Sequence, residues 1–405
     1  MEKHINCFFN DKISTIILLI VPIITIFFAN SLYMYEEILS LQDSKSYILI
    51  AENPLNYFYV QHQEALRIFP GILVFFFKFT GLSTEICFQI ITYFSFIFLH
   101  FKIFGLFKKY EIKNYLSLTA IAILIYANHS IIYTVFNYFQ LVDLITYILI
   151  VYFIELHKKL NVKKLFVISL IAILTKEYLL IMVLSLYIRH LILHYNKNLI
   201  ISLSFILLIF ILHYNFAALH VESQQEKNDL IYIIKNLVQD YPLFIDSLFN
   251  GLFLEKNIFL FFPFILLLFS IKFIYFLRKY FSIVVFVFVP LGFSLFLFHN
   301  VGNNFFRVFY HGYFIMILFC LLFLFDEVVK NNISKILIFI SPLFFIIDYI
   351  YILNNIKQDG FFYYFQILRY QYLSGYYFFN IIIILILIMN FKNLFLKTFD
   401  EKYEK

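Results

Sequence analysis

Long apolar segments separated by short polar ones run through this 405-residue chain. A helix needs about 20 apolar residues to cross the hydrocarbon layer of a membrane. Ten segments meet that length, near residues 13–30, 85–107, 115–134, 138–156, 198–218, 258–277, 281–298, 309–325, 336–353 and 376–395. The pattern predicts an all-α, polytopic transmembrane helical bundle that forms a single integral membrane domain over residues 1–405, with no separate soluble domain.

The apolar segment at 164–195 is interrupted by Thr175, Lys176 and Glu177. It could be one long helix with a charged pair near its middle, or two short spans forming a hairpin with that pair at the tip. Lys and Arg residues gather near 108–113, 158–164, 189–197, 278–279, 330–335 and 392–405. All of these face the cytoplasm, as the positive-inside rule requires, only if 164–195 crosses the membrane twice. The hairpin interpretation predicts about 12 spans with both termini cytoplasmic.

Composition narrows the functional classes. A hydrophobic content of 63%, a charged content of 14% and a mean hydropathy of +0.87 leave too little polar surface for a soluble globule of this size. The net charge of +6 lies in short segments between apolar spans, so it indicates sidedness and not a nucleic-acid partner. The sequence has no Walker-type Gly-Lys-Ser/Thr motif and no CxxC spacing, so we expect neither ATP-driven chemistry nor a zinc site.

The first outer loop, residues 31–83, is the longest polar interval of the chain and the candidate catalytic loop. Asp43, Tyr47 and Ala51 recur at a spacing of four, which predicts one face of a short helix. The apolar run from Phe69 to Phe79 is too short to cross the membrane, and its Pro70 start and Gly81 end predict an interfacial helix.

This order of parts resembles the GT-C superfamily of membrane glycosyltransferases. That superfamily includes polyprenyl-phosphate-sugar-dependent protein mannosyltransferases and lipid A aminoarabinose transferases, and the closest likeness is to bacterial multispanning proteins of cell-surface glycan loci. The resemblance rests on four short matches in order, namely Asp43-Ser-Lys-Ser-Tyr47 with Ala51, Arg67-Ile-Phe-Pro70 with Gly81, Leu174-Thr-Lys176, and Asn303-Asn-Phe-Phe-Arg307.

The resemblance implies a glycosyltransferase that moves a hexosyl or pentosyl group from a polyprenyl-phosphate carrier. The acceptor would be a glycan, a lipid or a protein at the outer face of the bacterial inner (plasma) membrane, during cell-surface glycan assembly. The expected partners are the lipid-linked donor, the acceptor and membrane lipids, without nucleic acid. No cofactor is expected; Glu36, Glu37 and Asp43 could hold a divalent metal, but their spacing does not require one.

Glycosyl transfer needs a base for the acceptor hydroxyl and cations for the departing phosphate. Asp43 is the candidate base, and Arg67, Lys176 and Arg307 are the candidate ligands of the donor phosphate. Each has a structural alternative. Asp43 could cap a helix, Lys176 could pair with Glu177 at the hairpin tip, and Arg307 could be an interfacial anchor that snorkels to headgroups.

Six further residues are candidate substrate contacts: Tyr47, Glu52, His62, Gln63, Asp143 and Glu177. Asp143 lies at the outer start of the fourth predicted span, where an unsatisfied charge costs a few kcal/mol. It could equally be a partner for a neighbouring helix.

Two other functions remain open at this point. A transporter or flippase of lipid-linked saccharides should carry charges within several spans, whereas the mid-span positions here are mostly Phe, Ile and Leu. An oligosaccharide polymerase or ligase usually has a large late loop, and here the corresponding segment, 354–375, is short although it contains Arg369 and several Tyr.

Overall fold

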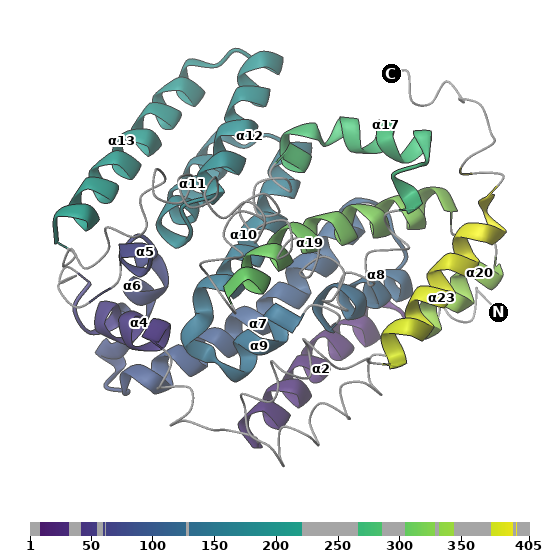
Figure 1. Cartoon of the computed structure of the whole chain (residues 1–405), viewed down its shortest axis with the longest axis horizontal. Helices are drawn as coiled ribbons and strands as arrows, with labels where there is room; N and C mark the ends of the chain where they lie inside the picture. Colours follow the sequence, from purple (N-terminus) through teal and green to yellow (C-terminus); the bar gives the residue numbers. More distant parts are fainter. Residues whose placement is uncertain are drawn as a thin grey trace, which may run out of the picture.

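The computed structural model describes residues 9–31, 42–54, 60, 62–126, 129–220, 266–285, 304–328, 332–343, 374–391 and 394. Within these ranges the chain is all-helical and has no strand, which confirms the predicted all-α class (Figure 1). Most of the predicted span at 281–298, the first part of that at 258–277 and the loops at 221–257 and 354–373 lie outside the described residues.

The helices follow one another in chain order. They are α2 (Asp11–Ser31), α4 (Gln42–Glu52), α5 (His62–Ala65), α6 (Ile68–Phe77), α7 (Thr84–Lys109), α8 (Asn114–Ile121), α9 (His129–Phe136), α10 (Leu141–Lys158), α11 (Val162–Thr175), α12 (Leu179–Leu193), α13 (Lys197–His220), α17 (Ile271–Lys279), α19 (Asn304–Phe323), α20 (Asn332–Ile340) and α23 (Ser374–Met389). Short 3₁₀ turns, η1 (Lys78–Thr80) and η3 (Tyr138–Gln140), and π-helical turns, η2 (Ala122–Tyr126) and η7 (Leu324–Val328), join some of them.

Four described helices are long and apolar enough to cross a membrane. They are Asp11–Asn30, Thr84–Lys109, Tyr138–Lys158 and Lys197–Ala217. Shorter apolar helices occur at Ile68–Thr80, Asn114–Tyr126, Leu179–Leu193, Phe314–Asp326 and Phe378–Met389. The membrane character predicted from composition is therefore supported, while the number of about 12 spans stays a prediction.

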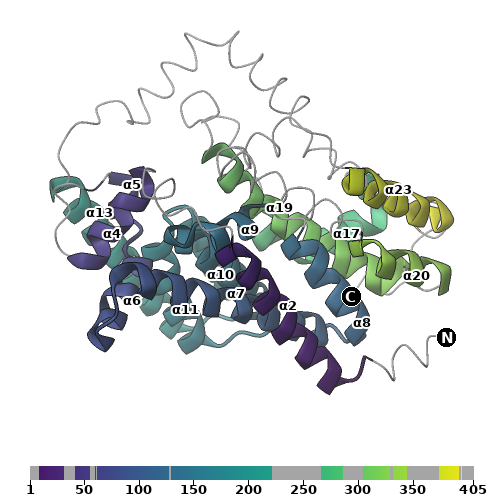
Figure 2. The ribbon, with the colours of Figure 1, turned by 90° about the horizontal axis from the view of Figure 1, so that it is seen from below.

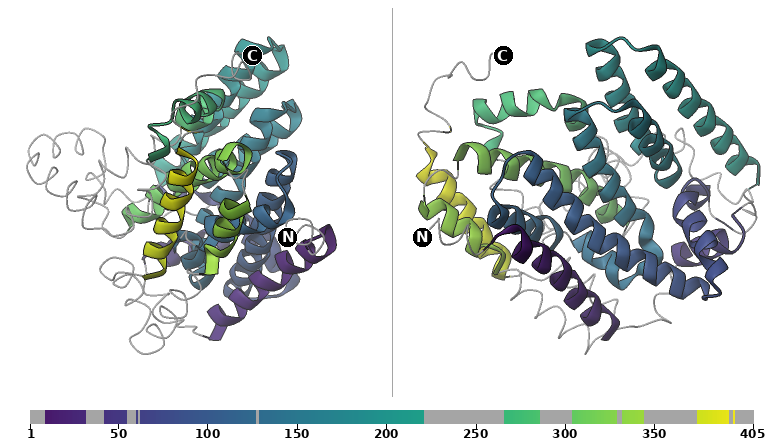
Figure 3. Two further views of the ribbon diagram at one scale, coloured as in Figure 1. Left: turned by 90° about the vertical axis from the view of Figure 1, so that its right-hand side faces the viewer. Right: turned by 180° about the vertical axis from the view of Figure 1, so that it is seen from behind.

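Helix α10 is the central element. Almost every side chain from Leu141 to His157 is buried, which is expected for a helix that is apolar on all sides. It packs against α6, α7, α9, α11, α12 and α19. Figures 1 and 3 show α2 on one side of this core and α13, beside α11 and α12, on the other. Apolar side chains on α2 and α13 remain exposed, Phe27 by 69% and Leu212 by 60%, as for helices that face lipid.

The segment at 164–195 forms two helices, as the hairpin interpretation requires. Helix α11 ends at Thr175, Lys176 has extended backbone angles (φ −157°, ψ 123°), and α12 begins at Leu179 and packs against α11. At the opposite end of these helices the basic segments meet. Lys158 Nζ donates to the carbonyl of Lys109 (2.8 Å), and Arg189 donates to the carbonyl of His157 (3.1 Å).

The first loop contains both predicted helices. Tyr47 and Ala51 are buried on α4, consistent with one shared face, and α4 packs on α6. Gly71 permits this approach, because a Cβ there would lie 2.5 Å from Cγ2 of Ile50. Helix α6 continues into η1 and ends at Gly81, whose φ of +85° favours glycine. Figure 2 shows α4, α5 and α6 grouped at one end of the molecule and α20 and α23 at the other.

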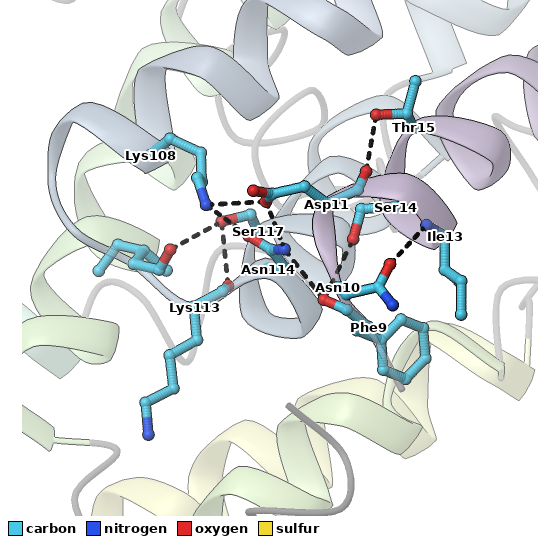
Figure 4. Close-up of polar contacts among 11 residues, drawn as sticks. Phe9, Asn10, Asp11, Ile13, Ser14, Thr15, Lys108, Lys113, Asn114 and Ser117 are labelled. Carbon is cyan, nitrogen blue, oxygen red and sulfur yellow. Dashed lines mark hydrogen bonds and ion pairs between the residues drawn. The ribbon is translucent and has the colours of Figure 1, made fainter. Parts of the chain in front are cut away.

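The start of α2 is fixed to the basic end of α7 (Figure 4). The Asp11 carboxylate accepts hydrogen bonds from Lys108 Nζ (3.1 Å) and Asn114 Nδ2 (2.9 Å), and Asn114 also donates to the carbonyl of Phe9 (2.9 Å). These contacts place the N-terminal end of the first candidate span beside the C-terminal end of the second, so the two helices run antiparallel.

Candidate functional site

Arg67 and Glu177 join the first loop to the hairpin tip across 110 residues of sequence. Arg67 lies just before α6, and Glu177 lies between α11 and α12. Two parallel hydrogen bonds connect them, from Nε to Oε2 (3.0 Å) and from Nη2 to Oε1 (2.7 Å). Such a bidentate contact is among the stronger side-chain interactions.

The environment of this pair keeps both groups charged. Burial alone would raise the pKa of Glu177, but the charge and hydrogen bonds of Arg67 outweigh it and hold that pKa below its usual value. Burial likewise opposes the charge of Arg67, and Glu177 more than compensates, so the pKa of Arg67 is raised. Their side chains keep exposed fractions of 12% and 30%, so the pair remains in contact with the surroundings.

Lys176, the residue before Glu177, forms a second ion pair with Asp143. The Lys176 ammonium donates to Oδ1 of Asp143, which lies in the first turn of α10. The two side chains are 2% and 0% exposed. Removing charges from water is costly, and a pair this deeply buried persists only with close contact and further hydrogen bonds.

His311 on α19 lies next to the Lys176–Asp143 pair and adds a further polar side chain to it. Its Nδ1 lies 2.5 Å from the Tyr178 hydroxyl, and its Nε2 lies 3.8 Å from Oδ1 of Asp143. The Tyr147 ring of α10 lies 4.7 Å from the His311 ring, centroid to centroid. Three parts of the chain, α10, the hairpin tip and α19, therefore meet in one buried polar cluster, Asp143–Lys176–Tyr178–His311.

The ion pairs at the hairpin tip bear on the structural alternatives for Lys176 and Asp143. Lys176 and Glu177 do not form their principal ion pairs with each other, because each has a carboxylate or guanidinium partner on another element. Asp143 does serve as a partner for a neighbouring element, which was one of its two interpretations.

Other predicted site residues lie in the same region of the fold. Helix α4 packs against α6 and η3, and η3 leads directly into α10 and Asp143. Tyr47 is buried on α4, whereas Glu52 is exposed at its end. The backbone positions of Asp43 (α4), His62 and Gln63 (α5) and Arg307 (α19) are described, but their side chains lie outside the described part of the structure, as do Glu36 and Glu37.

His311 was not among the predicted site residues. An ionisable residue inside an apolar span is a functional signal in membrane proteins, and this could have singled it out. It follows Arg307 by four residues, one turn of α19. Among the residues with described side chains, no group of three or more His, Cys, Asp or Glu is placed to hold a metal ion.

Comparisons with protein-family models, with curated proteins and with solved structures give no match.

Proposed function

We propose that this protein is a GT-C-type membrane glycosyltransferase, which moves a sugar from a polyprenyl-phosphate carrier to an acceptor at the outer face of the bacterial inner membrane. The observation that supports the proposal is the meeting of Arg67 and Glu177 beside Lys176 and Asp143. Two segments singled out by the resemblance, the start of the interfacial helix and the Leu-Thr-Lys turn, thereby come together.

In the proposed site Arg67 takes the donor phosphate. Its planar fork binds Glu177 through two hydrogen bonds, and the same fork matches the two oxygens of a phosphate. A bound phosphate would compete with Glu177 for the guanidinium. Lys176 is too deeply buried to meet a ligand in this arrangement, and Asp143 largely offsets its charge, so it would hold the hairpin tip in place beside Arg67. Arg307, one turn before His311, would be a further cation.

Asp43 is the proposed base. It lies on α4, which packs on the helix that follows Arg67. In the reaction the acceptor hydroxyl oxygen bonds to the anomeric carbon of the sugar and its proton passes to the Asp43 carboxylate. The bond between that carbon and the phosphate oxygen breaks, and the polyprenyl phosphate leaves with the electron pair. Cations near that oxygen stabilise its developing charge.

The test compares Asp43→Asn with Glu111→Gln, an exposed acid at the other end of the bundle. Asn caps helices as well as Asp but cannot accept the proton, so the proposal expects a loss of about 10² to 10⁴ in transfer rate with normal membrane insertion. The measurement is the surface glycan of a deletion strain complemented with each variant, and glycosidic bond formation by the purified protein. Full glycan production with Asp43→Asn would remove Asp43 as the base.

A proton-coupled transporter or flippase of lipid-linked saccharides is the second candidate. The observation that favours it is the buried Asp143–Lys176–Tyr178–His311 cluster, because ionisable groups inside a bundle also form proton relays. Proteoliposomes containing a fluorescent lipid-linked saccharide distinguish the two. Movement across the bilayer without a new glycosidic bond supports transport, and a new bond without movement supports transfer.

A further inference from the structure

A cavity of about 440 Å³ lies between the C-terminal ends of α7 and α10. It is lined by Leu106, Lys109, Tyr110, Glu155, Lys158 and Lys159. Asp143 and Lys158 are 15 residues apart on α10, so the cavity is about 22 Å from the cluster described above. It belongs to the basic end of the bundle, which the positive-inside rule assigns to the cytoplasmic face.

Glu155 anchors the lysines around this cavity. Its side chain is 5% exposed and its two oxygens accept from Lys102 (3.0 Å), Lys109 (3.1 Å) and Lys164 (3.4 Å). Lys102 and Lys164 also lie over the face of the Tyr152 ring, 3.8 and 4.6 Å from its centroid. One carboxylate therefore holds three ammonium groups, and positive charge is left in excess.

Lys158 and Lys159 add to this excess from the rim of the cavity. Both are exposed, and together with the three lysines on Glu155 they give the group a formal charge of +4. Carbonyl groups at the C-terminal end of a helix carry partial negative charge, which offsets part of this positive charge. Lys158 Nζ, for example, donates to the carbonyl of Lys109 (2.8 Å). That partial charge is smaller than the excess, so the group keeps a net positive charge that favours an anion.

An apolar surface leads along α7 toward the cavity. Phe94 and Phe98 are 69% and 43% exposed and precede Lys102 at a spacing of four residues, so all three share one face of the helix. Leu106 and the Tyr110 ring supply apolar walls inside the cavity itself. A basic cavity with an apolar helix face beside it fits an amphipathic ligand, with an anionic head and an apolar tail, better than a small soluble anion.

We propose that this cavity binds the phosphate headgroup of an anionic phospholipid of the inner leaflet. Lys158 and Lys159 donate to the phosphate, Lys109 and its partners on Glu155 supply the surrounding positive potential, and an acyl chain lies along the Phe94–Phe98 face of α7. The site is separate from the proposed transfer site, and its existence does not depend on that proposal.

The test uses the full-length protein in a non-ionic detergent. Native mass spectrometry measures the retention of added phosphatidylglycerol and phosphatidylcholine, which share a phosphodiester but differ in net charge. The proposal expects preferential retention of phosphatidylglycerol. Lys158→Gln/Lys159→Gln should weaken the binding of phosphatidylglycerol by on the order of tenfold, while Lys158→Arg/Lys159→Arg should preserve that binding. Lys12→Gln/Lys197→Gln removes the same charge from exposed positions outside the cavity and should leave it unchanged.

Far-UV circular dichroism establishes that each variant remains helical. Equal retention of the two lipids by the unmodified protein would overturn the proposal, and so would an equal loss in the Lys12→Gln/Lys197→Gln control. If inorganic phosphate at millimolar concentration displaced phosphatidylglycerol completely and stabilised the protein as much, the ligand would be soluble phosphate and the lipid assignment would be wrong.

Discussion

The buried pair between Lys176 and Asp143 allows a quantitative test of how this bundle is held together. Lys176→Met keeps the length of the side chain and removes its charge, which leaves the Asp143 carboxylate buried beside the His311 ring, 3.8 Å away. Because both side chains are at most 2% exposed, water cannot replace the lost partner. Breaking a buried ion pair in this way costs about 3–5 kcal/mol.

A double variant isolates the interaction energy between Lys176 and Asp143 from the contributions of their surroundings. Asp143→Asn alone removes the carboxylate that Lys176 contacts and should also cost about 3–5 kcal/mol, whereas Lys176→Met/Asp143→Asn removes both charges of the pair. The double variant should therefore be more stable than the sum of the single changes predicts, with a coupling energy of about 2–3 kcal/mol, within the range for contacting residues. Unfolding by SDS in mixed micelles, followed by far-UV circular dichroism, measures these free energies.

The Asp11–Lys108 pair serves as the matched control. It joins the same kinds of side chain at 3.1 Å, but they are 78% and 44% exposed, so Lys108→Met should change the unfolding free energy much less than Lys176→Met. If the Lys176→Met and Asp143→Asn effects were additive, or no larger than that of Lys108→Met, the idea that a desolvated pair holds the hairpin tip to α10 would be refuted.

Three other predictions follow from the site and the sidedness of the chain. Arg67→Lys keeps the charge but loses the planar guanidinium that forms two parallel hydrogen bonds, so the apparent KM for the lipid-linked donor should rise while folding is retained. An unchanged KM would show that Arg67 does not bind the donor. The pKa of Glu177 is lowered in the folded state, so the stability that it contributes is present above its unfolded pKa and is lost as the pH falls through the folded value. The difference in unfolding free energy between the unmodified protein and Glu177→Gln should be constant from pH 6 to 8 and shrink below about pH 5, and a difference that grew in acid would contradict the assignment. Cysteine replacing Glu52 should react with a membrane-impermeant maleimide from outside intact cells and cysteine replacing Lys159 should not, the reverse pattern being evidence for the opposite topology.

Local features of the fold were accessible from the sequence because they depend on neighbours in the chain. The short helix with Asp43 and Tyr47, and the apolar helix that ends at Gly81, follow from spacing and from the φ that glycine tolerates. The division of 164–195 into two helices followed from charge sidedness, which is a property of the whole chain. These elements were predicted with bounds close to those in the structure.

The partners within the site were not accessible in the same way. Spacing places Asp143 at the start of a helix and Lys176 at a turn, but it does not say which rotations bring them together. The predicted alternative that Lys176 pairs with Glu177 used the nearest neighbour in sequence, whereas folding selects partners 33 and 110 residues away. His311 was missed although its place inside an apolar span was a signal, and its contacts with Tyr147 and Tyr178 become visible only in the folded bundle.

Helix α10 shows why such polar contacts matter in an otherwise apolar bundle. A helix that is apolar on all sides has no preferred face, so burial alone fixes neither its rotation nor its height. Asp143 and Glu155 are 12 residues apart, which separates them by about 18 Å along the axis and by about 120° around it. Asp143 meets Lys176 of the hairpin and Glu155 meets Lys102 of α7, so the two carboxylates hold α10 to two different neighbours. A shift by one turn or a rotation by one position would separate both carboxylates from their lysines, and we infer that these contacts set the register of the central helix. Combining Lys176→Met with Glu155→Gln tests this inference, because it removes both sets of ion pairs. A loss confined to stability, with unchanged cysteine accessibility along α10, would show that packing alone sets the register.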